Sequence, residues 1–483
     1  MEVLEVQFKE IAKSYSLRSD ISYYSFVQKI LPSTLKTFKY PILWFVEFIK
    51  KINNGKDVKK EEYSISETRY VYLTVNNIKK YEIVFNEIIY LDEEVGEKLE
   101  RHRLEKGDLI ITRSGTVGIC KVFDIDNDEI IYIPSGYLII IKLKEGINKK
   151  FLEYYMSHEF IETFIRVHAA GKAQQNISQA YVKKIPIPNL PNTIQEKLVF
   201  EIEKIEEKIK GEKQKIVPLQ EVIDDVFVKY GVKTEKFKKG EFEVFTTNTL
   251  NIGKQKFLRC GAQYRAFWDV HGGLLFNGKT KYPIVKLGSL MRLHKAKTLK
   301  KGILDKEYIL IELEDIEQRA GKILNMDRVV SEIGSDKTYF GDADLITTKL
   351  RPYLGYTILN IPELELIGTT ELLPFKVNKD KAHPEYLKYV LLSHECLEKS
   401  QFLMYGKEHP RIHSLDLLSI KIPLPPKDVQ EKIISEIQKQ EKINDKAKQK
   451  LNDYRKQINN LMFEYLTKVG SEQDASSDRV QSL

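Results

Sequence analysis

Cysteine is scarce in this chain. Its 483 residues include only Cys120, Cys260 and Cys396, and these stand far apart with no CxxC spacing. Structural zinc sites and disulfide frameworks need closely spaced cysteines, so neither is expected. A reducing cytosol is the default compartment for a chain of this kind.

Long apolar runs are also lacking. One of the longest, from Ile42 to Ile49, is short and interrupted by Glu47, so no transmembrane helix is expected. The N-terminal residues include Glu2 and Glu5 and have no apolar centre, which argues against a signal peptide. A membrane is therefore not an expected partner.

Catalytic and metal-binding motifs are missing as well, with no HExxH and no GxSxG. The stretch from Gly273 to Thr280 fits the pattern GxxxxGK[ST]. Its interior is bulky and apolar, however, and Pro283 follows too soon for the helix that a phosphate loop requires. We expect no catalytic residue, no metal site and no cofactor in this chain. The net charge of +8 permits nucleic-acid binding without demonstrating it.

A repeat with the period of a whole domain is the most informative feature. Residues 185–188 read Ile-Pro-Ile-Pro and are followed by Gln-Glu-Lys at 195–197; residues 422–425 read Ile-Pro-Leu-Pro and are followed by Gln-Glu-Lys at 430–432. From Gln195 and from Gln430 the copies align without a gap, and 12 of 36 positions are identical. Gapless alignment is typical of a helix, because an insertion would rotate later side chains off their face. The chain therefore contains two copies of one module.

Each module is predicted to be an α+β domain. Strands rich in β-branched and aromatic residues are expected at 70–75, 108–112, 130–133 and 137–143, and again at 308–313, 344–348 and 372–377. Helices are expected at 149–166 and 384–402. At their ends stand His158 and His394, where a cation is usually structural. The predicted domains are 1–190 and 242–427, the long helices are 191–231 and 428–469, the linker is 232–241, and 470–483 form a disordered tail.

The long helix of each module has apolar residues at alternating spacings of three and four. The apolar positions include Leu198, Ile202, Ile205, Ile209 and Ile216 in the first helix, where Glu212 fills one gap. In the second helix they include Ile433, Ile437, Leu451, Ile458 and Leu461, and Gln440, Asn444, Ala447 and Tyr454 occupy the steps between them. Such spacing predicts a coiled coil, and two matched seams in one chain favour pairing with each other. The alternative is an amphipathic helix lying on its own domain. Pro218 should break or kink the first helix, and Gln440 and Asn444 make the second seam partly polar.

Two pairs of matched loops are the candidate binding sites. Arg113 and Ser114 follow one predicted strand, as Lys349 and Arg351 follow its counterpart. The second pair consists of Lys172, Gln174, Gln175 and Asn176 in one module and Lys407, His409 and Arg411 in the other. Arginine, lysine, asparagine and glutamine reach phosphates and base edges, so we predict DNA contacts for these residues. Ordinary polar surface loops are the alternative.

Together these motifs resemble the specificity subunits of type I restriction-modification systems. The resemblance rests on the runs GDLIITRSGTVG from Gly107 and ADLITTKLRPYLG from Ala343, and on the two IPxP…QEK elements. It implies two tandem target-recognition domains, whose following helices pack as an antiparallel coiled coil that sets the spacing between two DNA half-sites. It also implies a non-catalytic cytoplasmic subunit of a prokaryotic cell, which binds double-stranded DNA. Two methyltransferase subunits, which bind S-adenosylmethionine, and in many members motor-nuclease subunits are the implied partners.

The two modules differ in their predicted recognition loops, so an asymmetric bipartite target is expected rather than a palindrome. Three alternatives remain open at this stage. The chain could be the recognition subunit of another restriction-methylation class, or a coiled-coil adaptor without sequence preference. An enzyme is the third, and it rests on the phosphate-loop pattern alone.

Overall fold

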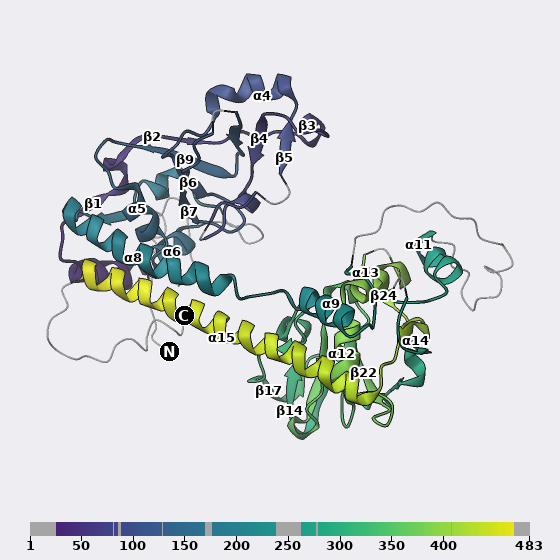
Figure 1. The fold of residues 1–483 in the computed structure, drawn as a ribbon. Helices are drawn as coiled ribbons and strands as arrows, with labels where there is room; N and C mark the ends of the chain where they lie inside the picture. Colours follow the sequence, from purple (N-terminus) through teal and green to yellow (C-terminus); the bar gives the residue numbers. More distant parts are fainter. Residues whose placement is uncertain are drawn as a thin grey trace. The chain divides into compact units, whose positions relative to one another are not determined.

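The computed structural model describes residues 26–80, 82–85, 88–127, 129–169, 176–237, 262–276, 279–406 and 408–467. The chain forms two compact units (Figure 1). Unit 1 comprises Met1–Gly211 and Lys450–Leu483, and unit 2 comprises Glu212–Gln449. None of the described helices is long and apolar enough to cross a membrane.

Each unit contains an antiparallel four-stranded sheet with the same strand order. In unit 1 the order is β2 (Ile49–Asn54), β9 (Leu138–Leu143), β6 (Leu109–Thr112) and β7 (Cys120–Val122). In unit 2 it is β12 (Met291–Leu293), β22 (Leu372–Val377), β19 (Leu345–Thr348) and β20 (Thr357–Leu359). The central strands β6 and β19 are buried along their whole length. The duplication read from the sequence therefore extends to strand topology.

A second sheet in each unit contains one parallel pair. Unit 1 orders β3 (Tyr63–Ser64), β5 (Ile89–Leu91), β4 (Tyr70–Leu73) and β8 (Ile131–Pro134), with β4 parallel to β8. Unit 2 orders β13 (Thr298–Leu299), β18 (Lys337–Tyr339), β21 (Leu366–Thr369), β14 (Gly302–Ile311) and β17 (Val329–Ile333), with β14 parallel to β21. All seven strands predicted from the sequence are present.

The helices predicted at 149–166 and 384–402 are each divided in two. Unit 1 has α5 (Lys149–Met156) and α6 (Glu159–His168), and unit 2 has α12 (Pro384–Leu392) and α13 (His394–Leu403). His158 caps α6 by accepting a hydrogen bond from the Phe160 amide at 3.3 Å, and burial lowers the pKa of this histidine to about 4. His158 therefore has the structural role that the sequence predicted, although it acts as an acceptor at the beginning of α6 and burial disfavours its cationic form.

The repeated proline motif forms a two-stranded ribbon that the following glutamine stabilises. In unit 1, β1 (Ile42–Trp44) pairs with β10 (Pro186–Pro188); in unit 2, β11 (Ile284–Lys286) pairs with β25 (Lys421–Pro423). Gln195 donates to the Leu190 carbonyl at 2.8 Å, and Gln430 donates to the Pro425 carbonyl at 2.9 Å. Both glutamines are buried, so the first letter of the repeated Gln-Glu-Lys serves this turn.

The long helix of the first module is interrupted. The structure has α8 (Asn192–Lys213) and α9 (Leu219–Lys229), with Pro218 as the N-cap of α9. The single helix predicted at 191–231 is therefore wrong, whereas the break predicted at Pro218 is confirmed. Proline cannot donate the hydrogen bond of a helix interior and crowds the preceding turn. The second long helix, α15 (Lys427–Leu466), runs without interruption.

Apolar side chains of the long helices are buried within each unit. In unit 1, Leu198 and Ile202 of α8 belong to the same core cluster as Met462 and Leu466 of α15. In unit 2, Ile223 of α9 shares a cluster with Ile433 and Ile437 of α15. Of the other predicted seam residues, Ile205, Ile209 and Leu451 are buried, whereas Ile216, Ile458 and Leu461 are half-buried.

Shorter elements complete the units. They are α3 (Leu31–Thr37), α4 (Glu93–Leu99) and α7 (Gln179–Val182) in unit 1, and α11 (Ala262–Arg265), α14 (Ser414–Ser419), β15 (Ile316–Glu317), β16 (Lys322–Ile323), β23 (Met404–Tyr405) and β24 (Arg411–Ile412) in unit 2.

Candidate nucleic-acid interface

The two predicted loops of the first module meet in unit 1. The loop after β6 begins at Arg113, whose amide donates to the Tyr137 carbonyl at 2.8 Å. The Arg113 carbonyl accepts from the Ile177 amide at 3.0 Å, and Ser114 pairs with Asn176 in an antiparallel bridge. Residues more than 60 positions apart in the sequence are thus joined by main-chain hydrogen bonds.

Unit 2 repeats this junction. The Lys349 amide donates to the Glu371 carbonyl at 2.9 Å, and the Lys349 carbonyl accepts from the Ile412 amide at 2.9 Å. Leu350 pairs with Arg411 in the same kind of bridge. Two elements of each module therefore build one composite loop surface, which is a common place for recognition residues on a rigid scaffold.

The predicted residues of unit 1 differ in their access to solvent. Asn176 is exposed and Arg113 is half-buried, so both side chains can reach a ligand. Ser114 is only 2% exposed, and its hydroxyl has no hydrogen-bond partner among the described residues. The fold gives Ser114 a place inside the junction, which does not favour the predicted DNA contact. Lys172, Gln174 and Gln175 lie outside the described residues.

In unit 2 the predicted cations also separate into two kinds. Arg351 is exposed and adopts a left-handed backbone conformation with φ of 45°. Arg411 forms two hydrogen bonds to the Glu371 carboxylate, at 3.0 and 2.9 Å; this pairing raises the pKa of Arg411 and lowers that of Glu371. Arg411 therefore holds the composite loop together, and most of its donors are already engaged. His409 is exposed, and Lys407 lies outside the described residues.

A hollow of about 440 Å³ lies beside the unit 1 junction. Its lining includes exposed Asn76, Lys79 and Tyr137 as well as Gly115 and Thr116. An amide, a cation and an aromatic ring are suited to contacts with base edges, phosphates and sugars. The sequence prediction assigned no DNA contact to Asn76, Lys79 or Tyr137, because only the fold brings them beside residue 114.

The turn that follows the parallel strand has opposite character in the two units. In unit 1 the Thr74 amide donates to the Asn77 side chain at 2.8 Å, and in unit 2 the Glu312 amide donates to Asp315 at 2.9 Å. The neutral Asn76 of the first turn corresponds to Glu314 in the second, an acidic residue 3.1 Å from Arg328. The same backbone turn thus carries neutral side chains in unit 1 and acidic side chains, each paired with a cation, in unit 2.

The family model of the type I restriction modification DNA specificity domain matches residues 275–453. Residues 275–453 carry a type I restriction-modification DNA specificity domain. The matched residues contain the unit 2 junction and most of that unit. The resemblance read from the repeated motifs is confirmed by this match.

Three solved structures are similar over most of their length. The S subunit of a type I restriction-modification system from M. genitalium shares 13% identity over 90% of this chain and 97% of its own, with a TM-score of 0.44. The HsdS subunit from Thermoanaerobacter tengcongensis shares 14% over 88% and 96%, with a TM-score of 0.29. A third structure, described as the structural basis of complex assembly and conformational transition of the type I R-M system, shares 15% sequence identity. The match covers 89% of this chain and 98% of the other, with a TM-score of 0.43. No curated protein matches the chain.

Lysine and arginine are exposed at one edge strand of the antiparallel four-stranded sheet in each unit. Lys50 and Lys51 lie on β2, and Arg292 lies on β12 with Lys295 just beyond it. None of the four forms an ion pair with another described residue. Charged edge strands resist edge-to-edge aggregation, and exposed cations also bind phosphates. The sequence prediction did not single out these four cations.

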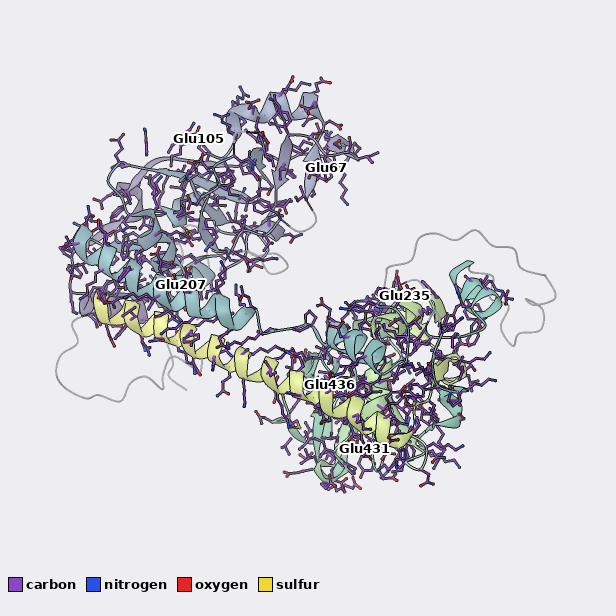
Figure 2. All side chains as sticks on the ribbon, in the orientation of Figure 1. Glu67, Glu105, Glu207, Glu235, Glu431 and Glu436 are labelled. Carbon is purple, nitrogen blue, oxygen red and sulfur yellow. The ribbon has the colours of Figure 1, made fainter. Side chains whose placement is uncertain are left out.

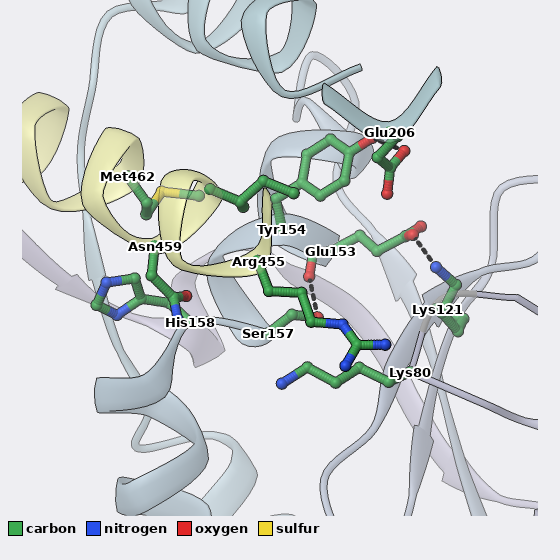
Figure 3. Close-up of a pocket in the computed structure, with 11 residues that line it drawn as sticks. Lys80, Lys121, Glu153, Tyr154, Ser157, His158, Glu206, Arg455, Asn459 and Met462 are labelled. Atoms are coloured by element: carbon green, nitrogen blue, oxygen red, sulfur yellow. Dashed lines mark hydrogen bonds and ion pairs between the residues drawn. The ribbon is translucent and has the colours of Figure 1, made fainter. Parts of the chain in front are cut away.

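A small pocket of about 50 Å³ in unit 1 holds charged groups that already have partners (Figure 3). Lys121 forms a buried ion pair with Glu153, whose second oxygen accepts from the Val122 amide at 2.9 Å. The Tyr154 hydroxyl donates to Glu206 of α8 at 2.6 Å. Burial raises the pKa of Tyr154, and the bond to Glu206 raises it further. These contacts tie α5 to the sheet and to α8, which is a structural role. No cluster suited to a metal ion occurs in the described ranges.

Proposed function

We propose that this chain is the DNA sequence-specificity subunit of a type I restriction-modification complex, with no catalytic activity of its own. The carrying observation is the DNA specificity domain at residues 275–453 together with the same loop junction in unit 1. Two copies of one reading device suit a DNA target made of two separate parts.

In this proposal each unit reads one half of an asymmetric target. Equal half-sites would need equal reading surfaces. The surfaces of the two units are unlike: Asn76 corresponds to Glu314, and Arg113 corresponds to Lys349 with a second cation at Arg351. We infer that the two half-sequences are not inverted repeats of each other.

The proposed contacts are the exposed or half-exposed donors at the two junctions. Arg113 and Asn176 serve the first half-site; Lys349, Arg351 and His409 serve the second. Arginine pairs with guanine and asparagine pairs with adenine through two hydrogen bonds each, and either side chain also binds phosphate. Lys50, Lys51, Arg292 and Lys295 are proposed as phosphate contacts that carry no sequence information.

The proposed spacer is an antiparallel coiled coil of the long helices. Two equivalent tyrosine–glutamate hydrogen bonds support this pairing. In one the tyrosine belongs to α15, and in the other the glutamate does. Tyr465 of α15 donates to Glu201 of α8 at 3.0 Å, and Tyr230, at the end of α9, donates to Glu436 of α15 at 3.0 Å. The end of each long helix thus contacts the beginning of the other, as antiparallel pairing requires. Glu436 is labelled on α15 in Figure 2.

The partners are proposed from the family resemblance. Two methyltransferase subunits would bind S-adenosylmethionine and modify adenine, and motor-nuclease subunits would join them in a restriction-competent complex. In this proposal the chain would recognise the DNA sequence at which the partner subunits act, in the cytoplasm of a prokaryotic cell.

Genome-wide mapping of methylated adenine tests the proposal. Cells with and without this gene are compared while the neighbouring methyltransferase gene is kept intact. Loss of one split motif with a fixed spacer is expected when the gene is deleted. An unchanged methylation map would contradict the proposal and favour the adaptor alternative.

Complementation with variants then separates reading from folding. Arg113→Ala is expected to alter recognition in one half of the motif only. Lys236→Ala, in an exposed pair with Asp225, is the control that should restore the wild-type map. A motif whose halves proved to be inverted repeats would rule out the asymmetry.

A further inference from the structure

The interruption between α8 and α9 leaves main-chain N–H and C=O groups without helical hydrogen-bond partners. Two side chains of α15 bond to these groups instead. Asn444 accepts from the Val217 amide at 3.2 Å and donates to the Val217 carbonyl at 2.7 Å. Gln440 donates to the Lys215 carbonyl at 3.1 Å and to the Asn444 side-chain oxygen at 3.0 Å. All of these residues belong to unit 2. We call this set of four hydrogen bonds the amide lock.

The duplicated helix shows that these amides belong to the interruption. In the gapless alignment Gln440 corresponds to Ile205 and Asn444 corresponds to Ile209, both buried apolar seam residues. The counterpart of Pro218 is Asp453, which lies inside the uninterrupted α15. Amides therefore stand in the copy that meets exposed main-chain groups, and isoleucines stand in the other copy.

The lock can be satisfied in only one register. Apolar seams tolerate a shift of one helical turn, because one isoleucine can replace another in a hole of the facing helix. An amide bonded to both the N–H and the C=O of one residue has no equivalent partner a turn away. A single polar residue in a coiled-coil seam is a known means of fixing register.

We propose that Gln440 and Asn444 are positioning residues that fix the register of α15 against residues 215–217, and thereby the number of base pairs between the two half-sites. This inference rests on the proposed function, since only a bipartite reader has such a spacing. Neither residue contacts DNA in the proposal. They act through the helix that carries them.

The decisive variant introduces the residues of the other copy, Gln440→Ile with Asn444→Ile. In the methylation map we expect both half-sequences to be retained, while methylation spreads to targets with a longer or shorter spacer. A change of protein stability alone would lower methylation everywhere without moving it to new spacers. A single unchanged spacer at the wild-type level of methylation would overturn the inference.

A second substitution tests the cause. Pro218→Asp places the counterpart residue in the first copy and allows the helix to continue, so that Val217 regains helical partners. In this background the two isoleucine substitutions are expected to restore a single spacer. Spacer spreading that persisted in the triple variant would show that the interruption is not what the amides serve.

Two further readouts cover other outcomes. If the isoleucine variant directs no methylation, Asn444→Asp is tested instead. This variant keeps the acceptor for the Val217 amide but removes the donor to the Val217 carbonyl. Its binding to synthetic duplexes whose spacers differ by single base pairs then tests the inference. Binding to several spacers supports the lock, and binding to one wild-type spacer overturns it. A wild-type chain that directs no split motif at all would refute the proposed function itself, which is a separate result.

Discussion

Replacing Lys233 should unfold unit 2 far more readily than replacing its neighbour Lys236. The Lys233 side chain is 1% exposed and lies 2.6 Å from Asp224 of α9 and 2.5 Å from Glu395 of α13. These carboxylates are 6% and 9% exposed, so without the lysine two buried negative charges would face each other. Breaking a buried ion pair from one side typically costs about 3–5 kcal/mol.

Lys236→Met is a matched control for Lys233→Met. Lys236 pairs with Asp225, also on α9, but the two side chains are 66% and 53% exposed. An exposed pair contributes about 0–1 kcal/mol. Methionine keeps most of the apolar volume of lysine, so the comparison isolates the charge. The expected difference between the variants is therefore at least about 2 kcal/mol.

Urea unfolding of the full chain can report on unit 2 alone. The sequence contains two tryptophans, Trp44 in unit 1 and Trp268 in unit 2. In a Trp44→Phe background the remaining fluorescence follows unit 2. At about 1–3 kcal/mol per molar urea, Lys233→Met should lower the midpoint by about 1 M or more. Equal midpoints for Lys233→Met and Lys236→Met would refute the reasoning, because burial would then have added nothing to the pair.

Three other results are expected. His158 has an unfolded pKa near 6.5 and a folded pKa of about 4, so stability present above pH ~6.5 declines as the pH falls toward 4, by up to about 3 kcal/mol. His158→Gln should abolish this decline in unfolding experiments, and an unchanged pH profile would be contrary evidence. Arg351→Ala should relax one base position at a cost of about 1–3 kcal/mol or, for a phosphate contact, lower the salt slope by about 1; unaltered binding and slope would exclude both roles. Tyr230→Phe and Tyr465→Phe should destabilise their own units by similar amounts of about 1–2 kcal/mol in urea, whereas a loss in only one unit would contradict their equivalence.

Much of the fold could be read from the sequence because its determinants are local and duplicated. Short apolar runs in the sequence predict strands such as β6 and β19, and the gapless repeat predicts long helices. Pro218 was correctly predicted to interrupt its helix. The partner of the main chain in this gap could not be foreseen, because Asn444, which bonds Val217, is more than 200 positions away.

The candidate site was harder to predict, since side chains of the same type have different surroundings. Arg351 and Arg411 look equivalent in the sequence, but Glu371 engages only Arg411, from 40 positions away. Ser114 is polar and lies in a loop, yet the bridge to Asn176 buries it. The exposure of a side chain and the identity of its bonding partner depend on tertiary contacts, which local sequence composition does not reveal.

The interruption at Pro218 also leaves a record that can be read in other genomes. A proline arising in one copy of a duplicated helix exposes main-chain groups, and selection can accept it only where the facing copy offers amides. Proline at this position and amides at positions 440 and 444 should therefore be inherited together. Lineages that lost the proline would be free to return to isoleucine, so the two copies would drift back toward likeness at these sites while their recognition loops continued to diverge.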